Sequence, residues 1–273
     1  MTRVVYLHGF ASGPASRKAR YFRDLLTARG FDVEIPDLAE GRFTELTITG
    51  QLTVVSRVCH GDQVVLIGSS LGGYLAALYA ARHAEVERVV LLAPAFSFAS
   101  HWAETLGEER MQGWQTTGRL SVFHYAENYQ RDLGWQFMVD ARRYEETPDF
   151  RQPGLIFHGS KDEAVPVAFS DRFAKGHENV TLRVLPSGHE LTDVLETMGT
   201  ETLAFLSVLN RQEYRDAWIG WHRRGLPVVE ADSQDLVPQS IVPLAAAGRK
   251  ARLTRLIPGY TLFAMSIRSL NTP

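Results

Sequence analysis

Short apolar runs alternate with longer stretches of helical period along most of the chain, and this alternation limits the possible folds more than any other feature. The runs consist mainly of Val, Ile, Leu and Phe and lie at residues 4–7, 32–35, 63–67, 88–92, 154–157 and 181–185. The helical stretches lie at residues 16–29, 44–60, 70–82, 167–175 and 192–209. Strands buried on both faces have nearly continuous apolar sequences. We therefore predict an α/β fold, a mostly parallel open sheet with helices on both faces.

Residues 97–149 interrupt this alternation between two predicted strands. The large aromatic residues of this insertion are Trp102, Trp114, Phe123, Tyr125, Tyr129, Trp135, Phe137 and Tyr144. A loop of this length without structure of its own would be unusual in a compact domain. We therefore predict a small helical cap over the carboxyl edge of the sheet. Most of its aromatic side chains should pack against one another, and some should face the cleft beneath the cap.

Residues 210–273 differ in character from the preceding part. They combine a basic run at residues 249–252 with several prolines and no steady hydrophobic period. We interpret them as a C-terminal extension of unknown structure, which follows a main domain at residues 1–209. The basic run is typical of a solvated surface.

Composition and charge exclude several classes of protein. Of the 273 residues, 45% are hydrophobic and 22% are charged, and the formal net charge is −2. These values are ordinary for a globular protein, and the nearly neutral balance gives no general attraction to nucleic acid or to anionic membranes. No segment approaches the roughly 20 apolar residues of a membrane span. A single cysteine, Cys59, permits no internal disulfide and is interpreted as a packed residue, so we expect a cytoplasmic location.

The segment Gly68-Ser69-Ser70-Leu71-Gly72-Gly73 joins a predicted strand to a predicted helix. A turn this sharp strains its central residue and crowds the positions two residues to either side. Glycine at 68 and 72 removes the Cβ atoms that would clash there. Ser69 does not fit the central position, because Ile67 lies two residues before it. Ser70 is therefore the candidate nucleophile, with its hydroxyl at the positive end of a helix dipole.

A serine hydroxyl needs a base, and the base needs a partner that orients it. His189 follows the last predicted strand in Pro186-Ser187-Gly188-His189-Glu190, so it is the candidate base. Asp162 follows the strand at 154–157 and is the candidate acid, with Glu163 as the competing carboxylate. The order serine, acid, histidine along the chain is not that of the chymotrypsin or subtilisin types.

Acyl transfer also needs donors for the oxyanion of the tetrahedral intermediate. The amide of Leu71, directly after the nucleophile, is one candidate. The amide of Phe10, in the loop after the first strand, is the other, and Gly9 permits its close approach. His8 in the same loop is interpreted as a residue that shapes the loop through hydrogen bonds to the backbone.

The remaining histidines form no pattern typical of metal ligation, neither His-x-His nor His-Glu-x-x-His. The chain also contains no Gly-x-Gly-x-x-Gly sequence and no phosphate-binding loop. We therefore expect no metal and no cofactor.

Four segments together resemble the landmark blocks of α/β-hydrolase enzymes: the strand followed by His8-Gly9-Phe10, the elbow at residues 68–73, the segment from His158 to Pro166, and Ser187-Gly188-His189-Glu190-Leu191. The resemblance covers roughly residues 2–209. The early position of the oxyanion loop is similar to that of small bacterial esterases that lack the first two strands of the fold. The resemblance implies a serine hydrolase that cleaves carboxylic esters through an acyl-enzyme. Residues 210–273 depart from the pattern, since such enzymes commonly end with the helix that follows the histidine.

The sequence thus predicts a carboxylesterase-type serine hydrolase whose partner is a small-molecule ester or thioester. A peptidase or amidase would use the same triad and differ only in the cap. A ligand-sensing protein of the same fold would keep the triad but turn over slowly. The sequence does not reveal the natural substrate, the preferred acyl length or the oligomeric state.

Overall fold

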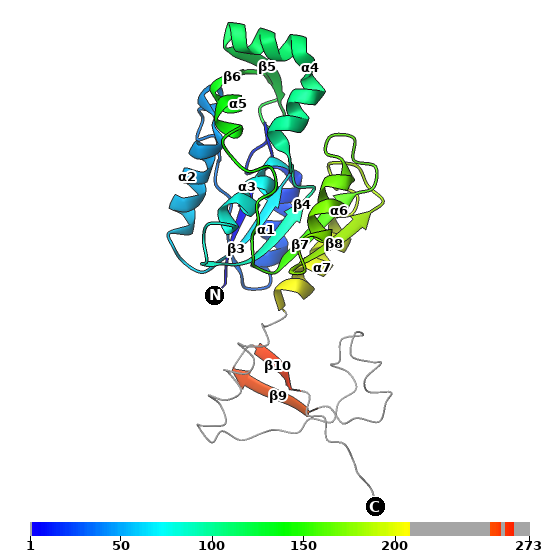
Figure 1. Ribbon diagram of the computed structural model, residues 1–273. Helices are drawn as coiled ribbons and strands as arrows, with labels where there is room; N and C mark the ends of the chain where they lie inside the picture. Colours follow the sequence, from blue (N-terminus) through cyan, green and yellow to red (C-terminus); the bar gives the residue numbers. More distant parts are fainter. Residues whose placement is uncertain (1, 208–251, 258–259, 265–273) are drawn as a thin grey trace, which may run out of the picture. The chain divides into compact units, whose positions relative to one another are not determined.

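The computed structural model describes residues 2–207, 252–257 and 260–264. Contacts within the chain divide it into two compact units, residues 1–208 and 209–273. The first unit contains a six-stranded sheet in the order β2-β1-β3-β4-β7-β8, in which every neighbouring pair is parallel (Figure 1). Its strands are β1 (Arg3–Leu7), β2 (Asp32–Glu34), β3 (Val64–Ser69), β4 (Val86–Leu92), β7 (Gly154–Gly159) and β8 (Val180–Leu185). The predicted α/β fold with a parallel sheet is confirmed.

Helices cover both faces of this sheet. They are α1 (Arg17–Thr27), α2 (Ile48–Cys59), α3 (Leu71–Ala80), α6 (Val167–Lys175) and α7 (Leu195–Ser207). Val4 and Tyr6 of β1 belong to the core cluster that includes residues of α1 and α7, whereas Val5 and Leu7 belong to the cluster that includes residues of α2 and α3. Because successive strand residues point to opposite faces, the central strands need apolar residues on both faces, and their sequences are mostly apolar.

The edge strand β8 and the beginning of helix α2 differ from what the sequence predicted. β8 lies at the sheet edge, and each of its residues is either exposed or half-buried. The helix predicted at 44–60 is divided: residues Phe43–Glu45 form a 3-10 turn, η1, and α2 begins at Ile48. Thr47 separates the two, because its side chain caps α2 by accepting a hydrogen bond from the amide of Gly50 at 2.9 Å.

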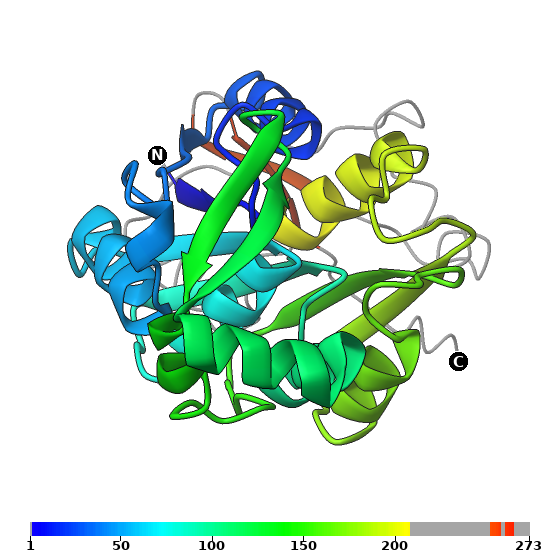
Figure 2. The same cartoon turned by 90° about the horizontal axis from the view of Figure 1, so that it is seen from above.

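The insertion is the cap, and it is helical only in part. It contains α4 (Phe98–Thr117), an antiparallel hairpin of β5 (Arg119–His124) and β6 (Tyr129–Gly134), and α5 (Gln136–Ala141). Leu120 and His124 of β5 are buried, whereas Ser121 and Phe123 are exposed, which is the two-residue period of a strand. Seen from above, the hairpin and α4 cross the body of the unit (Figure 2). The purely helical cap predicted from the sequence therefore needs this correction.

The hairpin is held on the body through the loop after β1. The amide of Tyr125 donates to the carbonyl of Ala11 at 2.8 Å, and the ring of His124 meets the ring of Phe43 edge-on at 4.7 Å. In Figure 1 the cap lies beyond the carboxyl ends of the parallel strands. The cap therefore roofs the edge of the sheet at which Leu7, Ser69 and Gly159 end their strands.

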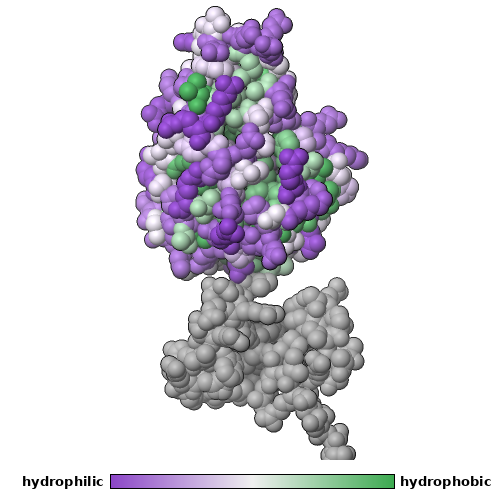
Figure 3. Space-filling model, in the orientation of Figure 1, coloured by the Kyte–Doolittle hydropathy of each residue, from purple (hydrophilic) through white to green (hydrophobic). Residues whose placement is uncertain are grey.

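In the second unit, β9 (Arg252–Ile257) and β10 (Tyr260–Ala264) form an antiparallel pair. The prolines and the basic residues 249–251 noted in the sequence lie outside the described residues. Across the described ranges, no helix combines the length and the apolar character needed to cross a membrane. The face of the first unit in Figure 3 is largely hydrophilic, with scattered smaller apolar areas.

Candidate active site

The turn from β3 to α3 forms a strained elbow at Ser70. Its backbone angles, φ 54° and ψ −118°, lie in a region that residues other than glycine rarely occupy. A Cβ atom at Gly68 would overlap the carbonyl of Gly72, and one at Gly72 would overlap the carbonyl of Leu7. Both overlaps are with backbone atoms, which cannot turn aside. The turn therefore has room only for glycine at both positions.

Ser70, His189 and Asp162 lie within hydrogen-bond distance of one another in series. The Nε2 atom of His189 is 3.0 Å from the Oγ atom of Ser70, and its Nδ1 atom is 2.8 Å from Oδ2 of Asp162. The three residues follow β3, β8 and β7, so the parallel sheet brings them to one edge. The side chain of His189 is 20% exposed and that of Asp162 is fully buried. This geometry suits proton transfer from Ser70 to His189.

The carboxylate of Asp162 is surrounded by donors. Its Oδ1 atom accepts hydrogen bonds from the amides of Ala164 at 3.0 Å and Val165 at 2.8 Å. Burial acts to raise the pKa of Asp162, but hydrogen bonds from His158, His189 and the Val165 amide outweigh it and hold that pKa well below its ordinary value. Asp162 is therefore an anion beside the imidazole. Glu163, the competing acid, is exposed and makes no hydrogen bond to His189.

Of the two candidate oxyanion donors, Leu71 directly follows Ser70, and Phe10 lies in the loop after β1. Leu71 is the first residue of α3, so its amide has no acceptor within the helix. The amide of Ser70 itself is occupied, because it donates to the carbonyl of Leu92 at 2.8 Å. Gly9 brings the loop of Phe10 against the nucleophile, since a Cβ atom at position 9 would lie 3.4 Å from that of Ser70.

His8 holds this loop through both of its ring nitrogens. Nε2 accepts a hydrogen bond from the amide of Leu38 at 3.1 Å, and Nδ1 donates to the carbonyl of Gly9 at 3.0 Å. Because an amide can only donate and a carbonyl can only accept, the ring is the neutral tautomer with its proton on Nδ1. Burial lowers the pKa of His8 and favours this neutral form. His8 therefore shapes the loop and is not placed as a base.

Aromatic residues from the cap surround Phe10. Its ring centroid lies 5.3 Å from that of Trp102 and 5.7 Å from that of Phe137. Phe137 and Trp114 are fully buried and pack within the cap, whereas Phe10 and Trp102 are only half-buried. These two rings are therefore the candidates for contact with an apolar group of a ligand at the elbow.

Two residues near the triad were not singled out from the sequence. The side chain of Lys18 is 10% exposed and its Nζ atom lies 3.9 Å from Oε2 of Glu190, next to His189. Burial lowers the pKa of Lys18. The helical period could have indicated it, because residue 18 shares a face of α1 with the buried Phe22. The second residue is His158, which is fully buried and lies beside Asp162.

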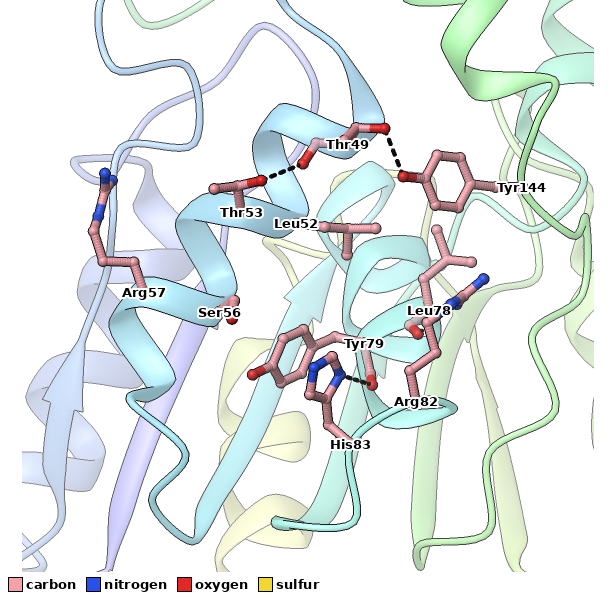
Figure 4. A pocket seen from close by; sticks show the side chains of 10 residues that line it. All are labelled: Thr49, Leu52, Thr53, Ser56, Arg57, Leu78, Tyr79, Arg82, His83 and Tyr144. Atoms are coloured by element: carbon pink, nitrogen blue, oxygen red, sulfur yellow. Dashed lines mark hydrogen bonds between the residues drawn. The ribbon is translucent and has the colours of Figure 1, made fainter.

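A cavity of about 480 Å³ lies between α2 and α3, away from the triad (Figure 4). Its wall includes Leu78, Arg82 and Tyr144. Ser70 precedes α3, whereas Leu78 is eight residues further along it, a helical rise of about 12 Å. No triad residue lines this cavity. Arg82, one of its cations, is already paired with Glu145 at 2.6 Å. The cavity is therefore not the reaction centre.

The first unit corresponds to a defined protein family. A family model described as "Uncharacterised protein family (UPF0227)" matches residues 3–206. The chain belongs to this family. The match to UPF0227 includes the elbow, the candidate triad and the cap. No curated protein sequence matches the chain with significance.

Solved structures show the fold of this UPF0227 chain. Est1E from Butyrivibrio proteoclasticus with ferulic acid bound is 21% identical, with 75% of this chain and 90% of that chain covered and a TM-score of 0.61. Mouse alpha/beta hydrolase domain-containing protein 10 is 18% identical, with 75% and 89% covered and a TM-score of 0.65. The monoacylglycerol lipase of Paleococcus ferrophilus is 18% identical, with 75% and 93% covered and a TM-score of 0.60. The fold is that of the α/β hydrolases.

Proposed function

We propose that this protein is a serine hydrolase that cleaves small carboxylic esters or thioesters through an acyl-enzyme on Ser70. The observation that carries the proposal is the series of contacts from Ser70 Oγ to His189 Nε2 at 3.0 Å and from His189 Nδ1 to Asp162 Oδ2 at 2.8 Å. The strained elbow supports it, because strain of this kind persists at functional sites where the surroundings enforce it.

In the proposed reaction, Nε2 of His189 takes the proton of Ser70 as Oγ attacks the carbonyl carbon of the ester. Asp162 stabilises the imidazolium that forms. The amides of Phe10 and Leu71 donate to the oxyanion of the tetrahedral intermediate. The imidazolium then gives its proton to the leaving alcohol or thiol, and the acyl group remains on Ser70. In the second half, His189 activates a water that releases the acid and restores Ser70.

The cap supports a substrate with an apolar or aromatic group. Phe10 bears an oxyanion donor and its ring contacts Trp102, so an apolar group of the substrate would lie near the reacting carbonyl. Est1E, a structure of similar fold, binds ferulic acid, an aromatic carboxylic acid. We infer that this protein acts on small-molecule esters and, since its single cysteine is free and buried, that it works in the cytoplasm.

The test is the turnover of 4-nitrophenyl esters with acyl chains of increasing length. The proposal expects sustained multiple turnover on at least the short esters, and the matching anilides should be hydrolysed much more slowly. Faster cleavage of the anilides would indicate an amidase or peptidase. A single slow turnover, followed by an acylated protein that does not recover, would contradict the enzyme and favour a ligand-sensing protein.

A further inference from the structure

His158 lies in the same strand that leads to Asp162, and both of its ring nitrogens are engaged. It is fully buried, four residues before the candidate acid. Nδ1 lies 2.8 Å from the hydroxyl oxygen of Ser170, a fully buried residue of α6. Nε2 lies 2.9 Å from the carbonyl oxygen of Val165. The imidazole is thus held between α6 and the loop that carries Asp162.

The partners of His158 determine which nitrogen bears the proton. The carbonyl of Val165 can only accept a hydrogen bond, so Nε2 carries a hydrogen and donates it. A neutral ring then has a lone pair on Nδ1, which accepts from the hydroxyl of Ser170. The same Nε2–H edge lies 3.2 Å from Oδ2 of Asp162, the oxygen that also accepts from His189. The N–H group at Nε2 of His158 therefore lies beside the charged Oδ2 of Asp162.

Val165 connects His158 to the other oxygen of the carboxylate. Its carbonyl accepts from Nε2 of His158, and its amide donates to Oδ1 of Asp162 at 2.8 Å. When the imidazole fixes the carbonyl of Val165, it also limits the movement of the loop at residues 162–165. His158 can thus act on Asp162 in two ways, through the field of its Nε2–H and through the backbone of Val165.

We propose that His158, held by Ser170, is a positioning residue that keeps the Asp162 carboxylate oriented toward His189. The inference rests on the proposed hydrolase function and extends it by one residue that does not touch the substrate. Its role is to preserve the hydrogen bond between Asp162 and His189 during the reaction, when positive charge develops on His189.

Two substitutions at this position separate the role from simple packing. In His158→Gln, the side-chain amide nitrogen can occupy the place of Nε2 and still donate toward Val165 and Asp162. In His158→Asn, the shorter amide reaches only the place of Nδ1, and the donor is lost. We expect His158→Asn to lower kcat by about 10- to 100-fold, the scale of a small misplacement at a catalytic group. KM should stay nearly unchanged, and His158→Gln should regain most of the loss.

The pH profile gives a readout that packing alone would not move. With the carboxylate of Asp162 less well oriented, protonated His189 is less stabilised, so the acidic limb of the kcat/KM profile should move to lower pH in His158→Asn. It should stay in place in His158→Gln. Loss of folded protein would instead lower the rate equally at every pH. Titration of active sites with a fluorophosphonate measures the fraction of active protein separately. Equal losses in the two variants, with an unmoved limb, would overturn the proposal.

A proton NMR spectrum keeps this test independent of ester turnover. The Nδ1 hydrogen shared by His189 and Asp162 should give a far-downfield resonance that is absent in Asp162→Asn. The proposal expects this resonance to shift or broaden in His158→Asn and to remain in His158→Gln. An unchanged resonance in His158→Asn would overturn the positioning role even if the protein is an esterase. Failure of the wild type to cleave any ester would overturn the proposed function and leave the spectrum to decide the role of His158.

Discussion

Asp162→Asn replaces a buried carboxylate with an amide of almost the same size. The amide oxygen can still accept from Ala164 and Val165, which occupy Oδ1 in the native protein. The amide nitrogen then takes the place of Oδ2, which accepts from Nδ1 of His189 at 2.8 Å. Two donors cannot share one hydrogen bond, so the imidazole adopts the tautomer with its hydrogen on Nε2. That hydrogen faces Ser70, and the base is lost.

The expected loss in kcat is large, because the tautomer of His189 is changed. The equivalent change in a serine protease costs about 10⁴-fold in kcat. A similar loss here corresponds to about 5.4 kcal/mol of transition-state stabilisation, at about 1.36 kcal/mol for each tenfold step. KM should change little, because the side chain of Asp162 is fully buried. The assay is steady-state hydrolysis of 4-nitrophenyl acetate, corrected for the fraction of folded protein.

Glu163→Gln is the matched control. It makes the same chemical change one residue later, on an exposed side chain that forms no hydrogen bond to His189. Its kcat should equal that of the wild type. A large loss of kcat in Glu163→Gln, together with a nearly unchanged kcat in Asp162→Asn, would refute the assignment of Asp162 as the acid.

Comparison of the wild type with Asp162→Asn also tests the charge of Asp162 through stability. Its pKa is lower in the folded protein than its ordinary value. A lowered pKa contributes stability that is present above the ordinary value, about 3.9, and is lost as the pH falls toward the folded value. The Tm of the wild type should therefore fall more steeply below about pH 4 than that of Asp162→Asn. Parallel curves of Tm against pH for the two proteins would show that the hydrogen bonds to the Asp162 carboxylate do not stabilise its charged form.

Three further predictions concern the elbow, the base and the C-terminal extension. Gly72→Ala should destabilise the fold by about 3 kcal/mol or more, because its Cβ would overlap the carbonyl of Leu7. Gly113→Ala should not destabilise the fold, because no atom lies within 4 Å of the added Cβ. Equal urea midpoints for Gly72→Ala and Gly113→Ala would contradict this steric explanation. Ester hydrolysis should decline on acidification, because protonated His189 cannot accept the proton of Ser70, while Asp162 stays ionised owing to its lowered pKa. A flat rate from about pH 8 to pH 5 would argue against a histidine base. Truncation after Asn210 should leave at least roughly a tenth of kcat/KM, a loss of at most about 1.4 kcal/mol. An inactive or insoluble truncated protein would show that the extension shapes the site or completes the core.

The central strands were predictable because their environment is simple. Every position of Val64–Ser69 is buried, and Val64–Ile67 are all apolar, so no polar residue interrupts the run. Gly68 and Gly72 were predictable for a related reason, since each adjoins a backbone carbonyl that excludes any side chain. The two-residue period of β5 is hard to recognise, because β5 lies in an aromatic-rich segment for which we predicted a helical cap. Its buried positions include His124, which gives no apolar signal.

His158 illustrates what the sequence could not reveal. Its partners are the hydroxyl of Ser170 on α6, the backbone carbonyl of Val165 and the carboxylate of Asp162, and Ser170 lies outside the block at residues 158–166. A single buried histidine has no spacing rule that separates it from a packed side chain. Its contact with Ser170 forms only when α6 packs against β7.

The most direct test of the central claim is mass spectrometry of the protein after reaction with a fluorophosphonate. The account predicts one adduct per chain, on the peptide that contains Ser70, and its formation should block ester hydrolysis in proportion. In Ser70→Ala, which removes one oxygen atom, the adduct should be absent and ester turnover should fall by several orders of magnitude, about 10⁶-fold in a comparable triad. Circular dichroism should show the same fold. An adduct on Ser69 or Ser160, or undiminished turnover by Ser70→Ala, would contradict Ser70 as the nucleophile.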